Sequence, residues 1–252
     1  MKRTLTLIFL ALCLTLSLFG CGEAPVTTQT GTEGAGTTET LEATEEKEPI
    51  DFSNMIYSAI GDSITFGRDI NDPFPLVVKD ILGFRRAINY GIGSSTLTDT
   101  PTPGRNPMVL RYDKINKDSD IISIQGGGND YASLIPIGTP DSTDIRTFYG
   151  GLKALYGGLR KNHPDAFIFV ITPTALDVTW DDNQKMAAEY QEYRDVIVEV
   201  AAMYDFPVLD FWALPDYLEN TFDGVHPTQK YVTYTLAPMI ADFIKENYKK
   251  PN

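Results

Sequence analysis

The chain has 252 residues and a formal net charge of −13, with 22% charged and 42% hydrophobic residues. This acidic balance argues against binding to nucleic acid and against docking of the folded part on an anionic lipid surface. The two cysteines, Cys13 and Cys21, both lie near the start of the chain. A cysteine nucleophile, a zinc ribbon and a disulfide framework are therefore not expected in the remainder.

Residues 1–21 have the pattern of an export signal, in which Lys2 and Arg3 supply the charged start and a short apolar run follows. The run is too short for a permanent membrane span. Cys21 follows Leu18-Phe19-Gly20 and resembles the lipobox cysteine of bacterial lipoproteins, which is acylated and becomes the first mature residue. The alternative is an ordinary secretory signal with an incidental cysteine. We expect lipidation of Cys21, and hence an exported protein anchored by lipid to the outer face of a bacterial membrane.

Residues 22–50 are dominated by Thr, Glu and Gly and contain no aromatic residue. Such a segment cannot bury enough apolar surface to offset its ordering entropy, so we expect a disordered tether that its glutamates extend. Residues 51–252 carry a net charge of about −9 and suffice for one α/β domain with a well-buried core.

Five short apolar runs predict the β-strands of this domain, at 56–60, 86–90, 121–125, 167–172 and 207–211. Three of them are continuous runs of β-branched or aromatic residues, which is typical of strands covered on both faces. Helices are predicted at 74–82, 107–115, 145–162, 183–204 and about 229–248. The alternation predicts a five-stranded parallel sheet between two layers of helices, a three-layer α/β/α sandwich.

The polar and glycine-rich segments of the domain all follow predicted strands. They are 61–63, 91–94, 126–130, 172–174 and the loop that leads to His226. Ligands of parallel sheets bind at the carboxyl ends of the strands, so these segments are expected to meet at one edge and form a site.

Ser63 is the candidate nucleophile, and a serine hydroxyl needs a nearby base. His226 is favoured as the general base and acid over His163, which is expected in a surface turn. Asp223, three residues before His226, can bond the other ring nitrogen and fix the tautomer. No Gly-x-Ser-x-Gly elbow surrounds Ser63, which argues against the α/β-hydrolase fold.

A tetrahedral acyl intermediate also needs donors for its oxyanion. The candidates are the backbone amides of Ser63 and of Ser94, with Gly93 as the alternative to Ser94, and the side-chain amide of Asn129. Neighbouring glycines allow backbone amides to come close to a ligand.

Four motifs in this order resemble those of the SGNH (GDSL-type) hydrolases and extend over nearly all of residues 55–230. They are Gly61-Asp62-Ser63-Ile64, Asn89-Tyr90-Gly91-Ile92-Gly93-Ser94, Gly127-Gly128-Asn129-Asp130 and Asp223-Gly224-Val225-His226. Ser94 stands where many members have glycine. The resemblance implies a flavodoxin-like sandwich and ester hydrolysis through an acyl-enzyme, with no metal or organic cofactor. Members of the family remove acetyl groups from glycans, or act on lipids and thioesters.

Other residues of the predicted edge have less specific roles. Asp62, Asp130 and Asp210 are expected to bond loop amides and helix starts. Trp180, in the loop after the fourth strand, is either a platform on which a sugar stacks or a packing aromatic. The aspartates have no histidine or cysteine at ligand spacing, so no metal site is expected.

The preferred hypothesis is a serine esterase that acts on a small-molecule or glycan ester, with an acetyl group on a carbohydrate as the favoured substrate. The alternatives are a lysophospholipase or lipase and a non-catalytic surface module that binds a glycan. A nucleotide-binding protein is disfavoured because neither a P-loop nor a dinucleotide fingerprint is present.

Overall fold

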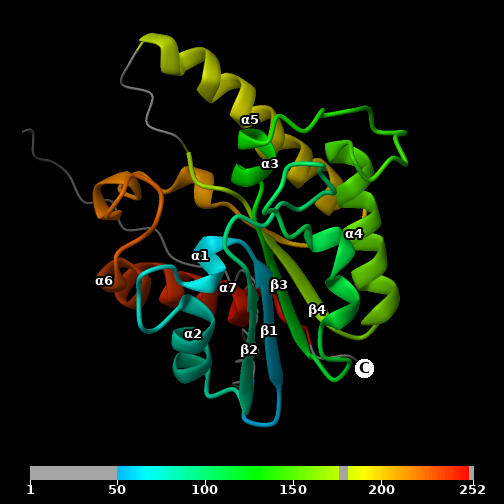
Figure 1. The fold of residues 1–252 in the computed structure, drawn as a ribbon. Coiled ribbons are helices and arrows are strands. Elements are labelled where there is room, and N and C mark those ends of the chain that lie inside the picture. Colours follow the sequence, from blue (N-terminus) through cyan, green and yellow to red (C-terminus); the bar gives the residue numbers. More distant parts are fainter. Residues whose placement is uncertain (1–49, 176–180, 250–252) are drawn as a thin grey trace, which may run out of the picture. The chain divides into compact units, whose positions relative to one another are not determined.

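The computed structural model describes residues 50–175 and 181–249, without the side chains of residues 181–187. Five strands of this part form one sheet, with the order β2-β1-β3-β4-β5 and every neighbouring pair parallel (Figure 1). They are β1 (Ile56–Gly61), β2 (Arg86–Gly91), β3 (Ile121–Gln125), β4 (Phe167–Ile171) and β5 (Val208–Leu209). The predicted α/β fold with a five-stranded parallel sheet is confirmed.

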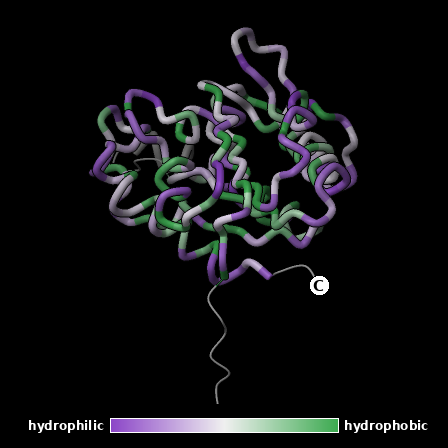
Figure 2. Tube along the Cα trace, turned by 90° about the horizontal axis from the view of Figure 1, so that it is seen from below, coloured by the Kyte–Doolittle hydropathy of each residue, from purple (hydrophilic) through white to green (hydrophobic). Residues whose placement is uncertain are grey.

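Helices cover both faces of the sheet. α2 (Phe74–Leu82) and α7 (Ala237–Asn247) pack on one face, and α4 (Phe148–Asn162) and α5 (Asp181–Ala202) pack on the other (Figure 1). Hydrophobic segments concentrate in the interior and hydrophilic segments at the periphery (Figure 2). In the described residues, no helix combines the length and the apolar character needed to cross a membrane.

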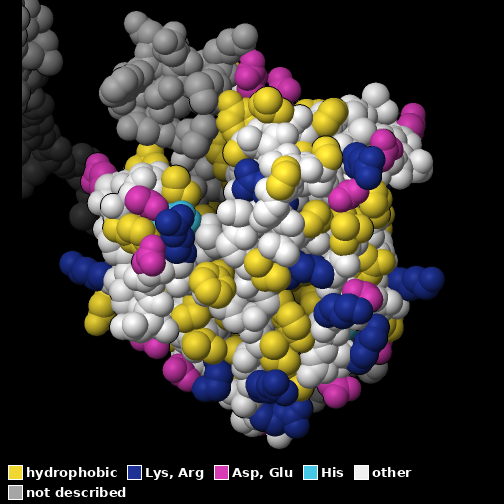
Figure 3. Space-filling view, in the orientation of Figure 1, with side chains coloured by type: hydrophobic (Ala, Val, Ile, Leu, Met, Phe, Trp, Pro, Cys, Tyr) yellow, Lys and Arg dark blue, Asp and Glu magenta, His cyan; other side chains and the backbone are white. Residues whose placement is uncertain are grey.

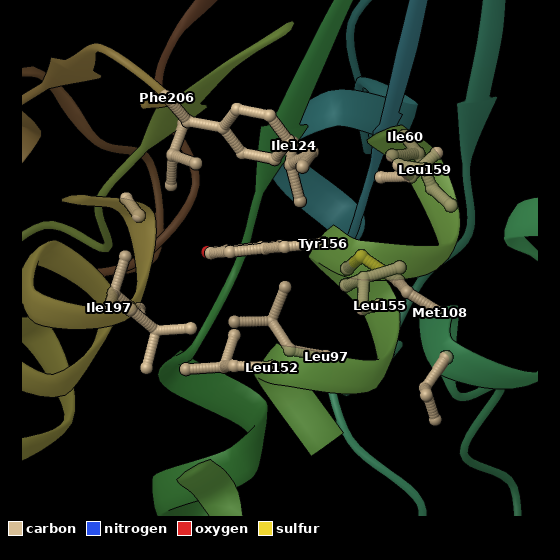
Figure 4. Packing of buried hydrophobic residues seen from close by; sticks show 14 of the residues in the cluster. Ile60, Leu97, Met108, Ile124, Leu152, Leu155, Tyr156, Leu159, Ile197 and Phe206 are labelled. Carbon is tan, nitrogen blue, oxygen red and sulfur yellow. The ribbon is translucent and has the colours of Figure 1, made fainter. Parts of the chain in front are cut away.

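Alternate residues of β4 enter two different cores, because successive side chains of a strand point to opposite faces. Phe169 and Ile171 belong to the cluster under α2 and α7, whereas Ile168 and Val170 belong to the cluster under α4 and α5. In that second cluster Tyr156 points from α4 into the interior among side chains of β3 and α5 (Figure 4). Strands buried on both faces explain the continuous apolar runs in the sequence.

The helix predicted at 107–115 is wrong in type. The segment forms two 3₁₀ turns, η1 (Met108–Leu110) and η2 (Tyr112–Lys114). Arg111 separates them with φ −139° and ψ 2°, outside the helical region. The backbone amides of Met108 and Val109 donate to Thr96 and Leu97, so the segment is shaped by the loop it packs against.

The helices predicted at 145–162 and 229–248 also differ from the structure. The first begins later than predicted, and the second is divided. α4 begins only at Phe148, because the Thr147 side chain accepts from the amide of Gly150 and caps the helix there. The last helix is divided into α6 (Gln229–Tyr231), a π-helical turn η5 (Val232–Leu236) and α7. Pro238 in the first turn of α7 has no N–H to donate, which accounts for the break in α-helical bonding.

Short elements follow the strands at their carboxyl ends. β1 leads into α1 (Ser63–Phe66) and β3 into α3 (Gly128–Ala132), while the last strand leads into the 3₁₀ turns η3 (Phe211–Ala213) and η4 (Leu218–Asn220). β5 is shorter than predicted because the Asp210 side chain accepts from the amide of Trp212 and starts η3. The loops at this edge carry the predicted site.

Gly91 at the end of β2 allows α1 to lie close to the sheet. A Cβ atom at this position would lie 2.2 Å from the backbone nitrogen of Phe66. We expect Gly91→Ala to displace α1, which begins with Ser63, to lower the free energy of unfolding by about 1–3 kcal/mol, and to lower ester hydrolysis. Urea denaturation and an esterase assay measure the two effects.

Gly93→Ala is the matched control for stability, because its Cβ would meet no atom within 4 Å. Equal free energies of unfolding for the two variants would contradict this account of the packing between α1 and β2.

Candidate active site

Ser63 lies at a sharp turn between a strand and a helix. β1 ends at Gly61, and Asp62 caps α1 by accepting a hydrogen bond from the amide of Ile64 at 2.9 Å. α1 has four residues and stops at Gly67, whose φ of 82° lies in the left-handed region. The turn therefore presents the Ser63 hydroxyl at the carboxyl edge of the sheet.

Asp223 and His226 share one short loop that is closed by its own backbone. The amide of Phe222 donates to the carbonyl of His226, and Thr221 pairs with Pro227 in an antiparallel bridge. Inside this loop Asp223 Oδ1 accepts from the backbone amides of Val225 at 3.1 Å and His226 at 2.8 Å. These bonds fix the carboxylate beside the imidazole.

The structure brings the three predicted catalytic residues into contact. His226 Nδ1 lies 2.7 Å from Asp223 Oδ2, and His226 Nε2 lies 2.8 Å from Ser63 Oγ. Partial burial acts to raise the pKa of Asp223, but hydrogen bonds from the backbone and ring of His226 prevail and lower it to about 2. An ionised Asp223 requires the proton on Nδ1, which leaves Nε2 free to accept the serine proton.

The predicted oxyanion donors line the same pocket as the triad. Gly93, Ser94 and Asn129 all face it, with Ser63 and His226 on its wall. Ser94 has φ 60°, a left-handed conformation that favours glycine. This conformation explains why many proteins with the similar motif have glycine at this position. Asn129, at the start of α3, donates from Nδ2 to the carbonyl of Ser95 at 3.0 Å.

Arg111 connects the ends of β1 and β2 to the loop that contains Ser95. This role was not predicted from the sequence. The Arg111 guanidinium donates to the carbonyls of Tyr90 at 2.7 Å and Gly61 at 3.1 Å, and to the hydroxyl of Ser95 at 2.9 Å. Burial lowers the pKa of Arg111 to about 10, so it still carries its charge at neutral pH. The sequence places Arg111 in a predicted helix at 107–115, and no motif there marks it as part of the site.

Two buried aspartates support the turns of the site. Asp62 caps α1, and Asp130 accepts from the amides of Leu97 and Thr98 and from the Thr98 hydroxyl at 2.8–3.1 Å. Burial raises the pKa of Asp62 to about 6 and that of Asp130 to about 7, although these hydrogen bonds oppose the shift. The contacts agree with the expected structural role of both residues.

Asp210 also bonds as expected. It accepts from the Thr172 hydroxyl at 2.7 Å and forms an ion pair with Arg194.

The pocket in front of the triad has a volume of about 730 Å³. Tyr131 and Tyr190 line it, with ring centroids 5.0 Å apart. Phe66 and Val225 also line it and remain 54% and 51% exposed. Figure 3 shows hydrophobic side chains among interspersed acidic and basic ones over this face of the molecule. Phe66 and Val225 are not predicted from the sequence to line the pocket, since their apolar character is equally typical of a core.

Three further predictions have different outcomes. Trp180 and Cys21 lie outside the described residues. The prediction that His163 lies in a surface turn is wrong, since it caps the end of α4 and is 3% exposed. Burial, and to a lesser extent Lys117, lower the pKa of His163. Within the described part of the chain, no group of three or more His, Cys, Asp and Glu side chains is arranged to hold a metal ion.

The sequence pattern of the GDSL-like lipase/acylhydrolase family matches residues 59–231. The chain therefore belongs to this family, and it is an acylhydrolase that acts on ester bonds. Comparison with curated proteins gives no match.

Solved structures share the fold. A protein from Lactobacillus plantarum is 24% identical, with a TM-score of 0.66 over 78% of this chain and 99% of that one. A GDSL-like lipase from Bacteroides ovatus is 18% identical, with a TM-score of 0.60 over 77% and 100%. A carbohydrate acetylesterase family member from Sinorhizobium meliloti is 17% identical, with a TM-score of 0.52 over 75% and 99%.

Asp130 should make stability depend on pH. Asn in its place can offer only one acceptor atom, so we expect Asp130→Asn to lower the free energy of unfolding by about 1–3 kcal/mol at pH 5. The folded chain holds the Asp130 proton up to about pH 7, whereas the unfolded chain releases it near pH 4. The advantage of Asp130 over Asn should therefore decrease as the pH rises from 4 to 8.

Urea denaturation of the two proteins across this pH range measures the difference. The exposed Asp118→Asn controls for the loss of one carboxylate charge. An advantage of Asp130 that grows with pH would contradict the assignment.

Proposed function

We propose that the protein is a serine esterase that works through an acyl-enzyme. The observation that carries the proposal is the continuous chain of hydrogen bonds from Asp223 through His226 to Ser63 Oγ at the wall of the pocket. In the first step Ser63 Oγ attacks the ester carbonyl carbon while His226 Nε2 takes its proton. The C–O bond to the alcohol then breaks, and the imidazolium returns that proton to the leaving oxygen.

Water completes the cycle. His226 removes a proton from a water molecule, and the water oxygen attacks the acyl carbon. The bond between this carbon and Ser63 Oγ then breaks, and Ser63 Oγ takes the proton back from His226. In both tetrahedral intermediates the oxyanion accepts from the amides of Ser63 and Ser94, with Gly93 as the alternative, and from Asn129 Nδ2. One donor of this kind is typically worth about 10²–10³ in rate.

We further propose an acetyl ester of a carbohydrate as the substrate. The pocket combines two tyrosine rings, Tyr131 and Tyr190, with the polar side chains of Asn129 and Thr174. An aromatic ring with a few polar groups around it suits a sugar, and Tyr131 is the more exposed of the two rings, since Tyr190 is 4% exposed. The shared fold with a carbohydrate acetylesterase family member is compatible with this choice.

A lipase or lysophospholipase is the second candidate. Phe66 and Val225 line the pocket and are more than half exposed, so an apolar acyl chain would bury surface there. The third candidate, a non-catalytic module that binds a glycan, has less support, since such a module does not need an aligned nucleophile, base and orienter.

Hydrolysis of p-nitrophenyl esters from acetyl to palmitoyl separates these candidates. We expect the full chain to prefer the acetyl ester, and Ser63→Ala and His226→Ala each to lower kcat at least about 10⁴-fold while the far-UV circular dichroism is unchanged. Asp223→Asn should lower kcat about 10³- to 10⁴-fold.

A preference for long chains would replace the acetylesterase by the lipase. Substantial turnover by a folded Ser63→Ala protein would end the acyl-enzyme proposal.

We also propose that the protein is exported and anchored by lipid on Cys21, on the evidence of the sequence pattern at residues 1–21. Expressed in a bacterium with labelled palmitate, the wild-type chain should incorporate label and partition into detergent, whereas Cys21→Ser should lose both properties. Equal labelling of the two chains would contradict the anchor.

A further inference from the structure

Arg105 contacts Ser94 and Asn129, the two predicted oxyanion-hole residues that lie outside the turn of Ser63. Its Nη1 donates to Asn129 Oδ1 at 3.3 Å and to the carbonyl of Ser94 at 3.4 Å. The side chain is half-buried, and its Nε atom is buried. The loop that carries Arg105 turns at Gly104, whose φ is 79°.

Within the described part of the chain, neither Arg105 nor Arg111 forms an ion pair with a carboxylate. A half-buried guanidinium without a carboxylate partner loses part of its hydration with no ion pair to offset that loss. The free charge of Arg105 is placed instead against an amide oxygen and a backbone carbonyl. This placement indicates a role that a neutral or paired side chain would not serve.

The first role concerns the orientation of the Asn129 carboxamide. An asparagine side chain has a donor end and an acceptor end of nearly equal size, and turning it over would present an oxygen to the developing oxyanion. The donor end of Asn129 bonds the carbonyl of Ser95, and the acceptor end bonds Arg105. Two partners of opposite kind therefore select one orientation.

The second role is electrostatic. A cation beside the amide oxygen of Asn129 draws electron density away from its nitrogen, which makes the remaining N–H a stronger donor. The same guanidinium holds the carbonyl of Ser94, a residue in the left-handed conformation. It thus stabilises the turn that directs the second donor.

We propose that Arg105 is a positioning residue of the oxyanion hole, which fixes the Asn129 carboxamide and the Ser94 turn so that both donors face the tetrahedral intermediate. This inference rests on the proposed acyl-enzyme mechanism. It distinguishes Arg105 from Arg111, which bonds the carbonyls of Gly61 and Tyr90 and holds the strand ends together.

A double-mutant cycle on the full chain tests the proposal. Arg105→Met keeps the length of the side chain but removes the charge and the donors, and Asn129→Ala removes the amide. With p-nitrophenyl acetate, Arg105→Met should lower kcat about 10- to 100-fold with little change in KM, and Asn129→Ala should lower it about 10²- to 10³-fold. In the Asn129→Ala background, Arg105→Met should lower kcat by a smaller factor than in the wild type, because only its contact with the Ser94 carbonyl is left to remove.

Three further variants separate positioning from folding. Arg105→Lys, which restores the charge without the planar fork, should recover part of the lost kcat. Arg146→Met, an exposed arginine paired with Asp99, should leave kcat unchanged. If Arg105→Met fails to fold, Arg105→Gln replaces it in the cycle.

Effects of Arg105→Met and Asn129→Ala that multiply independently, or an effect on KM alone, would overturn the proposal. Full activity in Ser63→Ala would instead overturn the acyl-enzyme mechanism, so the two failures are distinguishable.

Discussion

The hydrogen bond between Ser63 Oγ and His226 Nε2 joins two segments that are 163 residues apart in the sequence. Ser63 depends on the first strand and on the turn into α1. The position of His226 depends on the loop before α6, which follows all five strands in the sequence. The geometry of the site therefore requires the whole sheet and the segment that follows it. A large number of long-range contacts of this kind is typical of slowly folding α/β proteins.

Four charged side chains at the carboxyl edge of the sheet bond the main chain and hydroxyls instead of one another. Two buried carboxyl groups, Asp62 and Asp130, accept from backbone amides and hydroxyls, and two arginines donate to carbonyls. Each charged group is thereby tied to the main chain of a turn. Backbone partners hold a turn at a defined angle, whereas an ion pair between two long side chains at the surface leaves both ends mobile. Such turns suit a site whose donors must be placed before the reaction begins.

The sequence was most informative where one physical rule decided the outcome. The bounds of β3 and α2 follow from continuous apolar runs and from helical spacing, and the shared edge of Ser63, Asn129 and His226 follows from parallel pairing. The 3₁₀ turns around Arg111 and the π-helical turn before Pro238 depend on tertiary contacts that leave no periodic pattern. Arg105 and Arg111 could not be predicted, because an arginine that bonds carbonyls looks like any surface arginine until the loops are placed.

The loop at 221–227 carries the base and its orienter as a single unit, since Asp223 bonds both the ring and the backbone of His226. A local opening of this loop would separate the nucleophile from a base that remains correctly oriented by its carboxylate. Activity would then follow the closed fraction of molecules, with no change in the chemistry of those that are closed. If opening costs about 1.4 kcal/mol, roughly one molecule in ten is open at any moment. Residues such as Thr221 and Pro227, which do not line the pocket, would in this way set the fraction of enzyme that is ready to react.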